Sequence, residues 1–290
     1  MAFPTDQLDT TDLDVYLAEI WSTRKVNEFF RAKLVAAKFF YDASEDVVPG
    51  GDTIHIANLS AKTASTKTTD SAVTLQSDTE TKIDLSIDTW KESSCSIEDK
   101  QAVQVLRSYN LQQRYISACA FACAKALDTA LLGLYSGLSQ SVNDSASAIA
   151  DDDILLAIQY LDVEDVPVED RGFFFYPSMK TDLASIQKYY DASMWGGQTV
   201  VQTGTIPSLY GIPVFFSTQV TVTHTDYVHN LLAHKDAFAF ATQTPGGGAD
   251  GVRSQVNYVP EYLCTLWTSD VIYGVIENRD ACGIEIRAIK

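Results

Sequence analysis

The stretch that decides the fold runs from Thr53 to Thr89 and reads TIHIANLSAKTASTKTTDSAVTLQSDTETKIDLSIDT. Its 37 residues include 14 Ser or Thr and no Phe, Trp, Tyr, Gly or Pro. A flexible linker would be rich in Gly and Ser and a stiff one rich in Pro, whereas this segment is filled with β-branched residues that favour strands. The composition therefore predicts an ordered ribbon without a core of its own, covered by a neighbouring copy of the chain.

Both ends of this segment predict strands that pair with each other. Thr53–Ala57 alternates just after the breaker Pro49–Asp52, and the far end, KIDLSID, places Ile83, Leu85 and Ile87 on one face. If about a dozen residues run each way at about 3.3 Å per residue, the ribbon reaches about 40 Å. Such a ribbon extends beyond the radius of a domain of this size.

The composition indicates a folded chain with an acidic surface. Of its 290 residues, 46% are hydrophobic and 11% aromatic, which is enough for a real core in one or two domains. Lys and Arg total 21 against 38 Asp and Glu, so the formal charge is -17. Because phosphate binding needs clustered Lys and Arg, we expect no sequence-specific grip on nucleic acid, although an acidic wall can contain DNA without adhering to it.

The sequence contains few features that indicate targeting, a membrane span or a cysteine-based site. The first residues, MAFPTDQLDTTDLD, hold no basic region, and no window has about 18 consecutive apolar residues, so we expect neither a signal peptide nor a membrane span. The protein is therefore expected in a cytoplasm. Five cysteines without zinc-site spacing are predicted to be reduced and mostly buried: Cys95, Cys119, Cys123, Cys264 and Cys282.

Two long helical segments are predicted before residue 137. Residues 12–41 carry apolar side chains at helical spacing and predict a helical or partly helical N-terminal arm. Ser96 begins a capping-box pattern, SIED, and no Gly or Pro occurs from there to Leu132, so we expect one spine helix about 55 Å long. Its middle, Ser117–Ala126, consists mostly of small residues, which let another element approach its backbone closely.

Beyond Gly137 the pattern alternates between helices and strands. Three acids at 151–153 predict a helix start, because the helix dipole and the N-cap favour acids there. The apolar run GFFFY at 172–176 predicts a buried strand. The remaining elements are expected at 179–189 (helix) and at 212–217, 230–241, 252–259, 262–267, 271–277 and 282–289 (strands).

No catalytic, cofactor or metal site is predicted. The sequence holds no nucleophile elbow, phosphate loop or dinucleotide motif. His224, His229 and His234 recur every five residues, a spacing that fits neither a helix face nor a strand face, so they are interpreted as loop or strand-end residues rather than zinc ligands. Cys119 and Cys123 lie one helical turn apart among small apolar neighbours, which indicates core packing.

The ribbon supplies the candidate functional residues. We expect its lysines to be solvated or to pair with acids of an adjacent subunit; such pairs are individually weak but are repeated at every contact. The predicted inter-subunit contact residues are Lys62, Lys67, Val73, Leu75 and Lys82.

Four stretches carry a resemblance to a known family. They are GDTIHI at 51–56, VP at 166–167 with Arg171 and YP at 176–177, TG at 203–204 with LYGIPV at 209–214 and Ser217, and YGV at 273–275 with Asp280 and GI at 283–284. Their order, and the order of arm, ribbon, spine helix, α/β insertion and return strands, resembles the major capsid proteins of tailed phages, which have the Hong Kong 97 type fold. The resemblance covers nearly the whole chain.

The resemblance implies an α+β fold with four parts. These are an N-terminal arm (1–50), an extended β-ribbon or E-loop (51–90), a peripheral domain with the long spine helix (91–136 and 252–290) and an axial α/β domain (137–251).

It also implies a function in a virus particle rather than an enzyme activity. We expect a major capsid protein that self-assembles through hexamers and pentamers into the icosahedral head of a tailed bacteriophage, enclosing double-stranded DNA without cofactors and without a membrane. The expected partners are many copies of the chain, a separate scaffolding protein, a portal and a cement protein. The expected location is the virion shell, assembled in the cytoplasm of the host bacterium.

Three alternatives differ in class. An encapsulin-like compartment has the same fold but encloses an enzyme cargo. An α/β enzyme would need convergent polar side chains in one concave pocket. A tail or decoration protein would be an all-β chain without the long helix.

Overall fold

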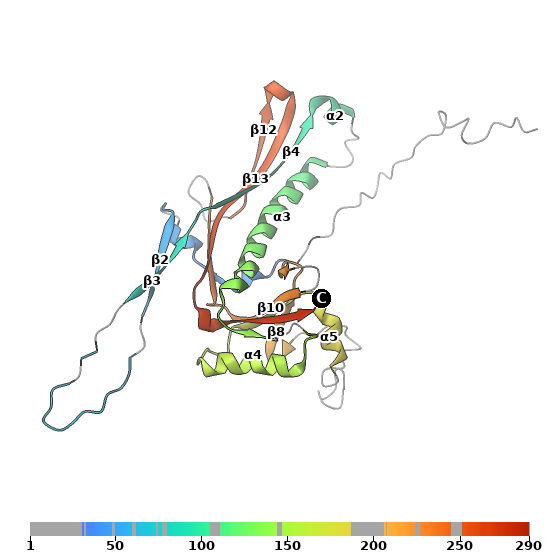
Figure 1. Cartoon of the computed structure of the whole chain (residues 1–290). Helices are drawn as coiled ribbons and strands as arrows, with labels where there is room; N and C mark the ends of the chain where they lie inside the picture. The colour runs from blue at the N-terminus through green and yellow to red at the C-terminus, as the bar shows by residue number, and fades with distance from the viewer. Residues whose placement is uncertain are drawn as a thin grey trace, which may run out of the picture.

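The fold consists of two sheets, a long helix and a projecting ribbon (Figure 1). The computed structural model describes residues 31, 33–47, 50–59, 62–73, 75–76, 80–104, 111–143, 147–186, 206, 208–223, 227–244 and 251–289. The ribbon leaves the body sideways, the long helix lies along one sheet, and the other sheet lies at the far end of that helix with two helices beside it. The mixed helix and strand content agrees with the predicted α+β class.

The first sheet is built around one long strand, β13. Its second half pairs with β11, its first half pairs with β12, and most of its length pairs with β4, all antiparallel. A short β1 adds to β11 in parallel. The strands are β1 (Tyr41–Asp42), β4 (Thr89–Glu98), β11 (Phe238–Gln243), β12 (Arg253–Val259) and β13 (Cys264–Glu277).

The prediction of two separate strands at 262–267 and 271–277 was wrong, because β13 continues through the polar stretch Thr268–Asp270. Polar partners within the sheet make this continuity possible. The Ser269 hydroxyl lies 2.8 Å from that of Ser254, and Asp270 accepts two hydrogen bonds from Arg253. A turn-like sequence therefore remains extended because neighbouring strands satisfy its polar groups.

The spine helix does not begin at Ser96 as predicted. Residues 96–98 belong to β4, where Ser96 pairs with Leu266, and the helical residues described are α2 (Asp99–Gln104) and α3 (Leu111–Leu132). The 22 residues of α3 span about 33 Å, and the continuity of one helix through residues 105–110 stays a prediction, because these residues lie outside the described part. The helix start at Ser96 was wrong because β4 alternates: Ser93, Cys95 and Ile97 are half-buried while the residues between them are exposed.

Helix α3 packs on β13 and β4 and passes into the 3₁₀ turn η4 (Gly133–Gly137). By length and composition alone, Gln113–Gly137 is apolar enough to cross a membrane. A core helix passes the same test, and Cys119, Cys123 and Leu131 of α3 are buried in this fold. That no membrane takes part stays a prediction.

The second sheet is centred on β10, which pairs antiparallel with β14 and β6. Strand β6 continues in parallel to β8, and all five residues of β6 are buried, as predicted for a strand covered on both faces. The strands are β5 (Ser141–Val142), β6 (Arg171–Phe175), β7 (Ser208–Leu209), β8 (Ile212–Phe216), β9 (Val222–Thr223), β10 (Tyr227–His234) and β14 (Gly283–Ile289).

Two helices accompany this sheet, α4 (Asp151–Val163) beside β14 and α5 (Met179–Ser185) after β6. The predicted helix start at 151–153 is confirmed, since the Asp153 carboxylate accepts the N–H of Ala150 at 2.9 Å. The predicted strand 230–241 is instead the end of β10 followed by β11 in the other sheet. The predicted helix 179–189 ends at Ser185, and residues 187–189 lie outside the described part.

The N-terminal arm is mostly not helical where it is described. Of the predicted helix 12–41, residues 12–30 and 32 lie outside the described residues, and the remainder contains only α1 (Ala36–Phe39). The buried Asp128 carboxylate of α3 accepts the N–H groups of residues 35, 36 and 37 at 3.4, 2.7 and 3.1 Å. Tertiary hydrogen bonds thus hold the chain here, with Phe39 and Phe40 packed on Phe174.

One continuous hydrophobic core joins the two sheets, with members from α3, β6, β10, β11 and β14. The sheets do not follow the expected domain boundaries: β14 of the segment 252–290 lies in the second sheet, and β11 of the segment 137–251 lies in the first. The division into peripheral and axial domains therefore stays a prediction. Short 3₁₀ turns complete the chain at η2 (Ser44–Val47), η5 (Pro260–Tyr262) and η6 (Asp280–Cys282).

Candidate assembly surface

The ribbon begins as a two-stranded hairpin base. Strands β2 (Thr53–Asn58) and β3 (Thr81–Ser86) pair antiparallel, with Ile54 opposite Leu85 and Ile56 opposite Ile83. The pairing of the two ends and the shared apolar face are therefore confirmed. Figure 1 shows the remainder of the segment projecting well beyond the body.

The root of the ribbon is fixed to the body by a small apolar cluster. Leu85 and Ile87 are buried with Ala43, Val47 and Ala241, and the N–H of Ile87 donates to the carbonyl of Asp52 at 2.8 Å. These contacts fix the inward face of the base, and no residue of the described tip belongs to a buried apolar cluster.

Gly274 of β13 lets the ribbon approach the first sheet closely. A Cβ at this position would lie 2.1 Å from the carbonyl oxygen of Ser86. Real side chains never approach a backbone oxygen so closely, so only glycine allows β3 to end against β13. The exit direction of the ribbon is thus set by the body of the protein.

The outward face of the base carries a charged cluster. Because Ile54 faces Leu85, His55 faces Asp84, and their Nδ1 and Oδ1 atoms are 2.6 Å apart. Lys82 Nζ lies 3.1 Å from the other Asp84 oxygen. The hydrogen bond from His55, and then that from Lys82, holds the pKa of Asp84 below its usual value. Lys82 thus pairs within its own ribbon, and the expectation that it contacts an adjacent subunit stays a prediction.

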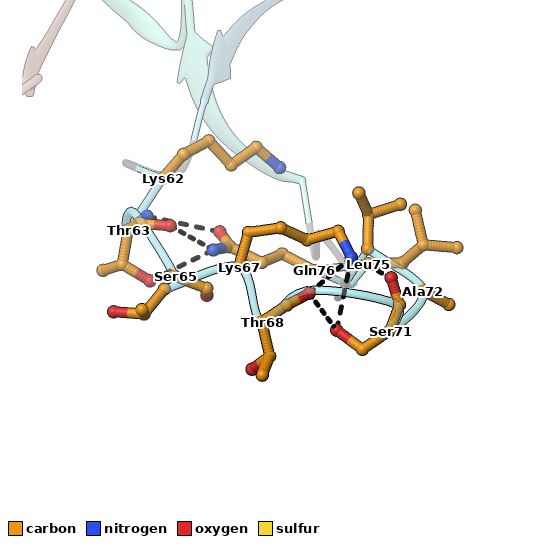
Figure 2. A pocket seen from close by; sticks show the side chains of 11 residues that line it. Lys62, Thr63, Ser65, Lys67, Thr68, Ser71, Ala72, Leu75 and Gln76 are labelled. Atoms are coloured by element: carbon orange, nitrogen blue, oxygen red, sulfur yellow. Dashed lines mark hydrogen bonds between the residues drawn. The ribbon is translucent and has the colours of Figure 1, made fainter.

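The tip is ordered by side chains instead of strand pairing (Figure 2). Gln76 reaches across the loop: its Oε1 accepts the N–H of Thr63 at 3.2 Å, and its Nε2 donates to the carbonyl and the hydroxyl of the same residue. Lys67 Nζ donates to the Thr68 carbonyl at 3.0 Å and to both oxygens of Ser71. The tip is therefore partly preorganised although no strand occurs among its described residues.

Several apolar side chains on this segment are largely exposed in the described part of the chain. Leu75 is 89% exposed, Leu59 77% and Val73 68%. The loop surrounds a hollow of about 560 Å³, but the hollow opens to solvent and is crossed by the loop's own hydrogen bonds. The hollow is therefore formed by the course of the loop and is not an enclosed ligand site. The exposed apolar side chains are suited to contact the surface of another protein.

The predicted contact residues fall into two groups. Lys62, Lys67, Val73 and Leu75 line the hollow of the tip loop, whereas Lys82 lies on β3 of the base. Sequence reasoning missed His55–Asp84 and Thr63–Gln76. The pair His55–Asp84 could have been predicted from the sequence, because aligning the two alternating ends with Ile56 opposite Ile83 also places His55 opposite Asp84.

The histidines and the cysteine pair form no metal centre in the described part of the chain, which contains no group of three His, Cys, Asp or Glu able to hold an ion. His229 stacks on Tyr135 and bonds to Glu285, and burial lowers the pKa of His234. His224 lies outside the described residues. The predicted core packing of Cys119 and Cys123 is confirmed, since both are buried.

Comparison with known proteins identifies the fold. No family model and no curated protein matches the sequence. Among solved structures, a chain from Mycobacterium phage Che8 is similar with a TM-score of 0.77 and 23% identity, covering 93% of this chain and 97% of that one. The capsid structure of cyanophage P-SCSP1u has a TM-score of 0.76 and 15% identity, covering 96% and 94%. The mature capsid of bacteriophage PhiM1 has a TM-score of 0.74 and 12% identity, and the match covers 94% of this chain and 92% of that one.

The chain has the fold of phage capsid subunits. The predicted Hong Kong 97 type α+β capsid fold is thereby confirmed as a fold. Identities of 12% to 23% over nearly complete chains mean that the arrangement of elements, more than individual residues, is what the chain shares with these structures.

Proposed function

We propose that this chain is a major capsid protein, which self-assembles into the icosahedral head of a tailed bacteriophage. The observation that carries the proposal is the similarity to capsid structures over at least 93% of the chain and 92% of theirs. A similarity limited to one module would leave the role of the rest open. Here nearly the whole of this chain matches nearly the whole of each of those chains.

In this proposal the ribbon fastens adjacent subunits to each other. Its root is fixed by Leu85, Ile87 and Gly274, while its tip presents Val73 and Leu75 without cover. A neighbouring subunit that covers the tip would remove these side chains from water, at about 25 cal/mol per Å² of apolar area. The tip lysines Lys62 and Lys67 would then face a partner whose chain is strongly acidic.

The net charge of -17 suits a shell that encloses DNA without binding it. We propose hexamers and pentamers as the assembly units, DNA as the content, and a separate scaffolding protein, a portal and a cement protein as partners. We place the finished protein in the virion and its assembly in the bacterial cytoplasm. The function then depends on interfaces, and no catalytic step is required of the chain.

Electron microscopy of the native or expressed particle tests the proposal. Closed shells, with DNA-filled tailed heads from the natural source, are the expected result. Small, uniform, DNA-free shells would instead favour the encapsulin-like compartment. A chain that stays monomeric by light scattering under every assembly condition would contradict both.

A point substitution tests the role of the tip. Leu75→Asp should lower particle yield at least tenfold while leaving the fold intact, because Leu75 is 89% exposed and contacts no core residue. Val168→Asp is the matched control, since Val168 is 70% exposed and lies in the loop between α4 and β6, away from the ribbon. Equal particle yields for the two variants, measured by sedimentation, would show that the tip does not fasten subunits.

A further inference from the structure

Two cysteines face each other between the spine helix and the sheet. Cys95 lies on the inward face of β4, opposite Trp267 of β13, and Cys119 lies on the face of α3 that covers this sheet. Their sulfur atoms are 3.9 Å apart. This distance is less than about 2 Å longer than the roughly 2.05 Å between the sulfur atoms of a disulfide bond.

The remaining cysteines are placed differently. Cys123, one turn further along α3, directs its sulfur to the carbonyl of Ser269 at 3.3 Å. Cys264 begins β13 and Cys282 lies in η6, and both are buried. Cys95 is the half-buried cysteine of the five, so an oxidant from solution reaches it first.

We propose that Cys95 and Cys119 are a site of oxidative modification, at which a low-molecular-weight disulfide converts the two thiols into a bond that clasps β4 to α3. The Cys95 thiolate attacks one sulfur of the oxidant and releases the first small thiol. The Cys119 thiolate then attacks the Cys95 sulfur and releases the second. The protein loses two protons and two electrons, and the oxidant is reduced to two thiols.

The surroundings set the rate of this reaction. Burial, with the neighbouring Cys119 as a second cause, raises the pKa of Cys95 to about 11. Since the thiolate is the nucleophile, closure is slow near neutral pH and accelerates as the pH rises towards that value. A thiol pair of this kind stays reduced in a cytoplasm and oxidises outside it.

The bond would connect residues 24 apart and close a loop that contains α2. The timing of bond formation rests on the proposed function: the two thiols stay reduced while shells assemble in a reducing cytoplasm, and the disulfide forms after release. The chemistry itself does not depend on that function, because both cysteines belong to one subunit.

Incubation of the purified full-length chain with oxidised glutathione at pH 8.5 to 9, followed by alkylation and non-reducing peptide mapping, tests the clasp. We expect a peptide pair joining Cys95 to Cys119, unchanged electrophoretic size, and a thermal midpoint raised by about 5 °C or more. Cys95→Ser and Cys119→Ser should each remove the bond, and Cys264→Ser should retain it. A mixed disulfide that stops at Cys95, a bond between other cysteines, or no bond would overturn the proposal.

The assay separates this inference from the proposed function. It needs only soluble protein, so failure to form particles leaves the mapping result interpretable. Conversely, shells that assemble normally from protein without the bond would leave the capsid role intact. A disulfide that forms without any change of thermal midpoint would overturn the claim that it stabilises the packing of β4 against α3.

Discussion

At the scale of single residues, the clearest feature is that the buried charged groups Asp270 and Arg171 each have several defined partners. Asp270 is 3% exposed and accepts bonds from Arg253 at 2.9 and 2.7 Å and from the Trp90 indole at 3.2 Å. Arg171 is 2% exposed, yet it pairs with Asp162 at 2.7 Å and donates to the carbonyl of Pro167 at 2.9 Å. Several hydrogen-bond donors or acceptors surround each of these groups and offset the cost of burying it.

Asp270→Asn should lower the free energy of unfolding by about 2 kcal/mol at pH 7, because Arg253 loses its charged partner. The hydrogen bond from Arg253 depresses the pKa of Asp270 in the folded state. Its stabilising effect is therefore complete above the unfolded pKa and is lost as the pH falls through the folded pKa. Urea unfolding at pH 7 and below pH 3 checks this: the gap between wild type and variant should shrink at the lower pH.

Asp128→Ala should release the segment that carries α1. The Asp128 carboxylate is fully buried and accepts three backbone N–H groups of that segment. Leaving these donors unsatisfied should cost about 2 to 4 kcal/mol, with Asp128→Asn losing less because it keeps an acceptor oxygen. Hydrogen exchange at residues 35–37 provides the measurement; unchanged protection in the alanine variant would contradict this role.

Some contacts lie between residues that a sequence pattern already brings together, and others do not. The pattern of Val166–Pro167 with Arg171 corresponds to a real contact, since the guanidinium donates to the carbonyls of both residues. In contrast, Asp128 contacts a segment 91 to 93 residues away. Nothing in the sequence near an isolated acid on a helix specifies such a partner.

At the scale of elements, alternation and composition predicted the ribbon but not the boundary between strand and helix. The capping-box pattern at Ser96 lies inside β4, and pairing with β13 outweighs the local helix signal. Tertiary context decides such cases, because strand pairing provides hydrogen bonds that the sequence alone does not reveal. The 14-residue length of β13 was missed for the same reason.

Gly274→Ala should disturb the root of the ribbon, since the added methyl group would overlap the carbonyl of Ser86. We expect a loss of about 1 to 3 kcal/mol in unfolding free energy and earlier proteolysis within the ribbon. Gly133→Ala is the matched control, because a Cβ at Gly133 meets no atom within 4 Å. Similar stability and similar cleavage rates for the two variants would show that the close approach at Gly274 does not position the ribbon.

At the scale of the whole molecule, the two sheets and the spine helix form one body around a continuous core, and the ribbon remains outside it. Two sequence segments that were expected to belong to different domains exchange strands between the sheets. The chain crosses between the sheets from β10 to β11 and from β13 to β14, and the continuous core joins them, so the body is suited to act as a rigid unit. In the proposed capsid, adaptation to neighbouring subunits is then left to the ribbon.

The most direct test removes residues 61–80 and joins the strands of the base with a short Asn-Gly turn. The apolar root and the body remain, so circular dichroism and the thermal midpoint should match those of the full chain. Cryo-electron microscopy of both proteins under the same assembly conditions should show closed shells for the full chain and none for the shortened one. Normal closed shells from the shortened chain would contradict the claim that the ribbon holds the subunits together.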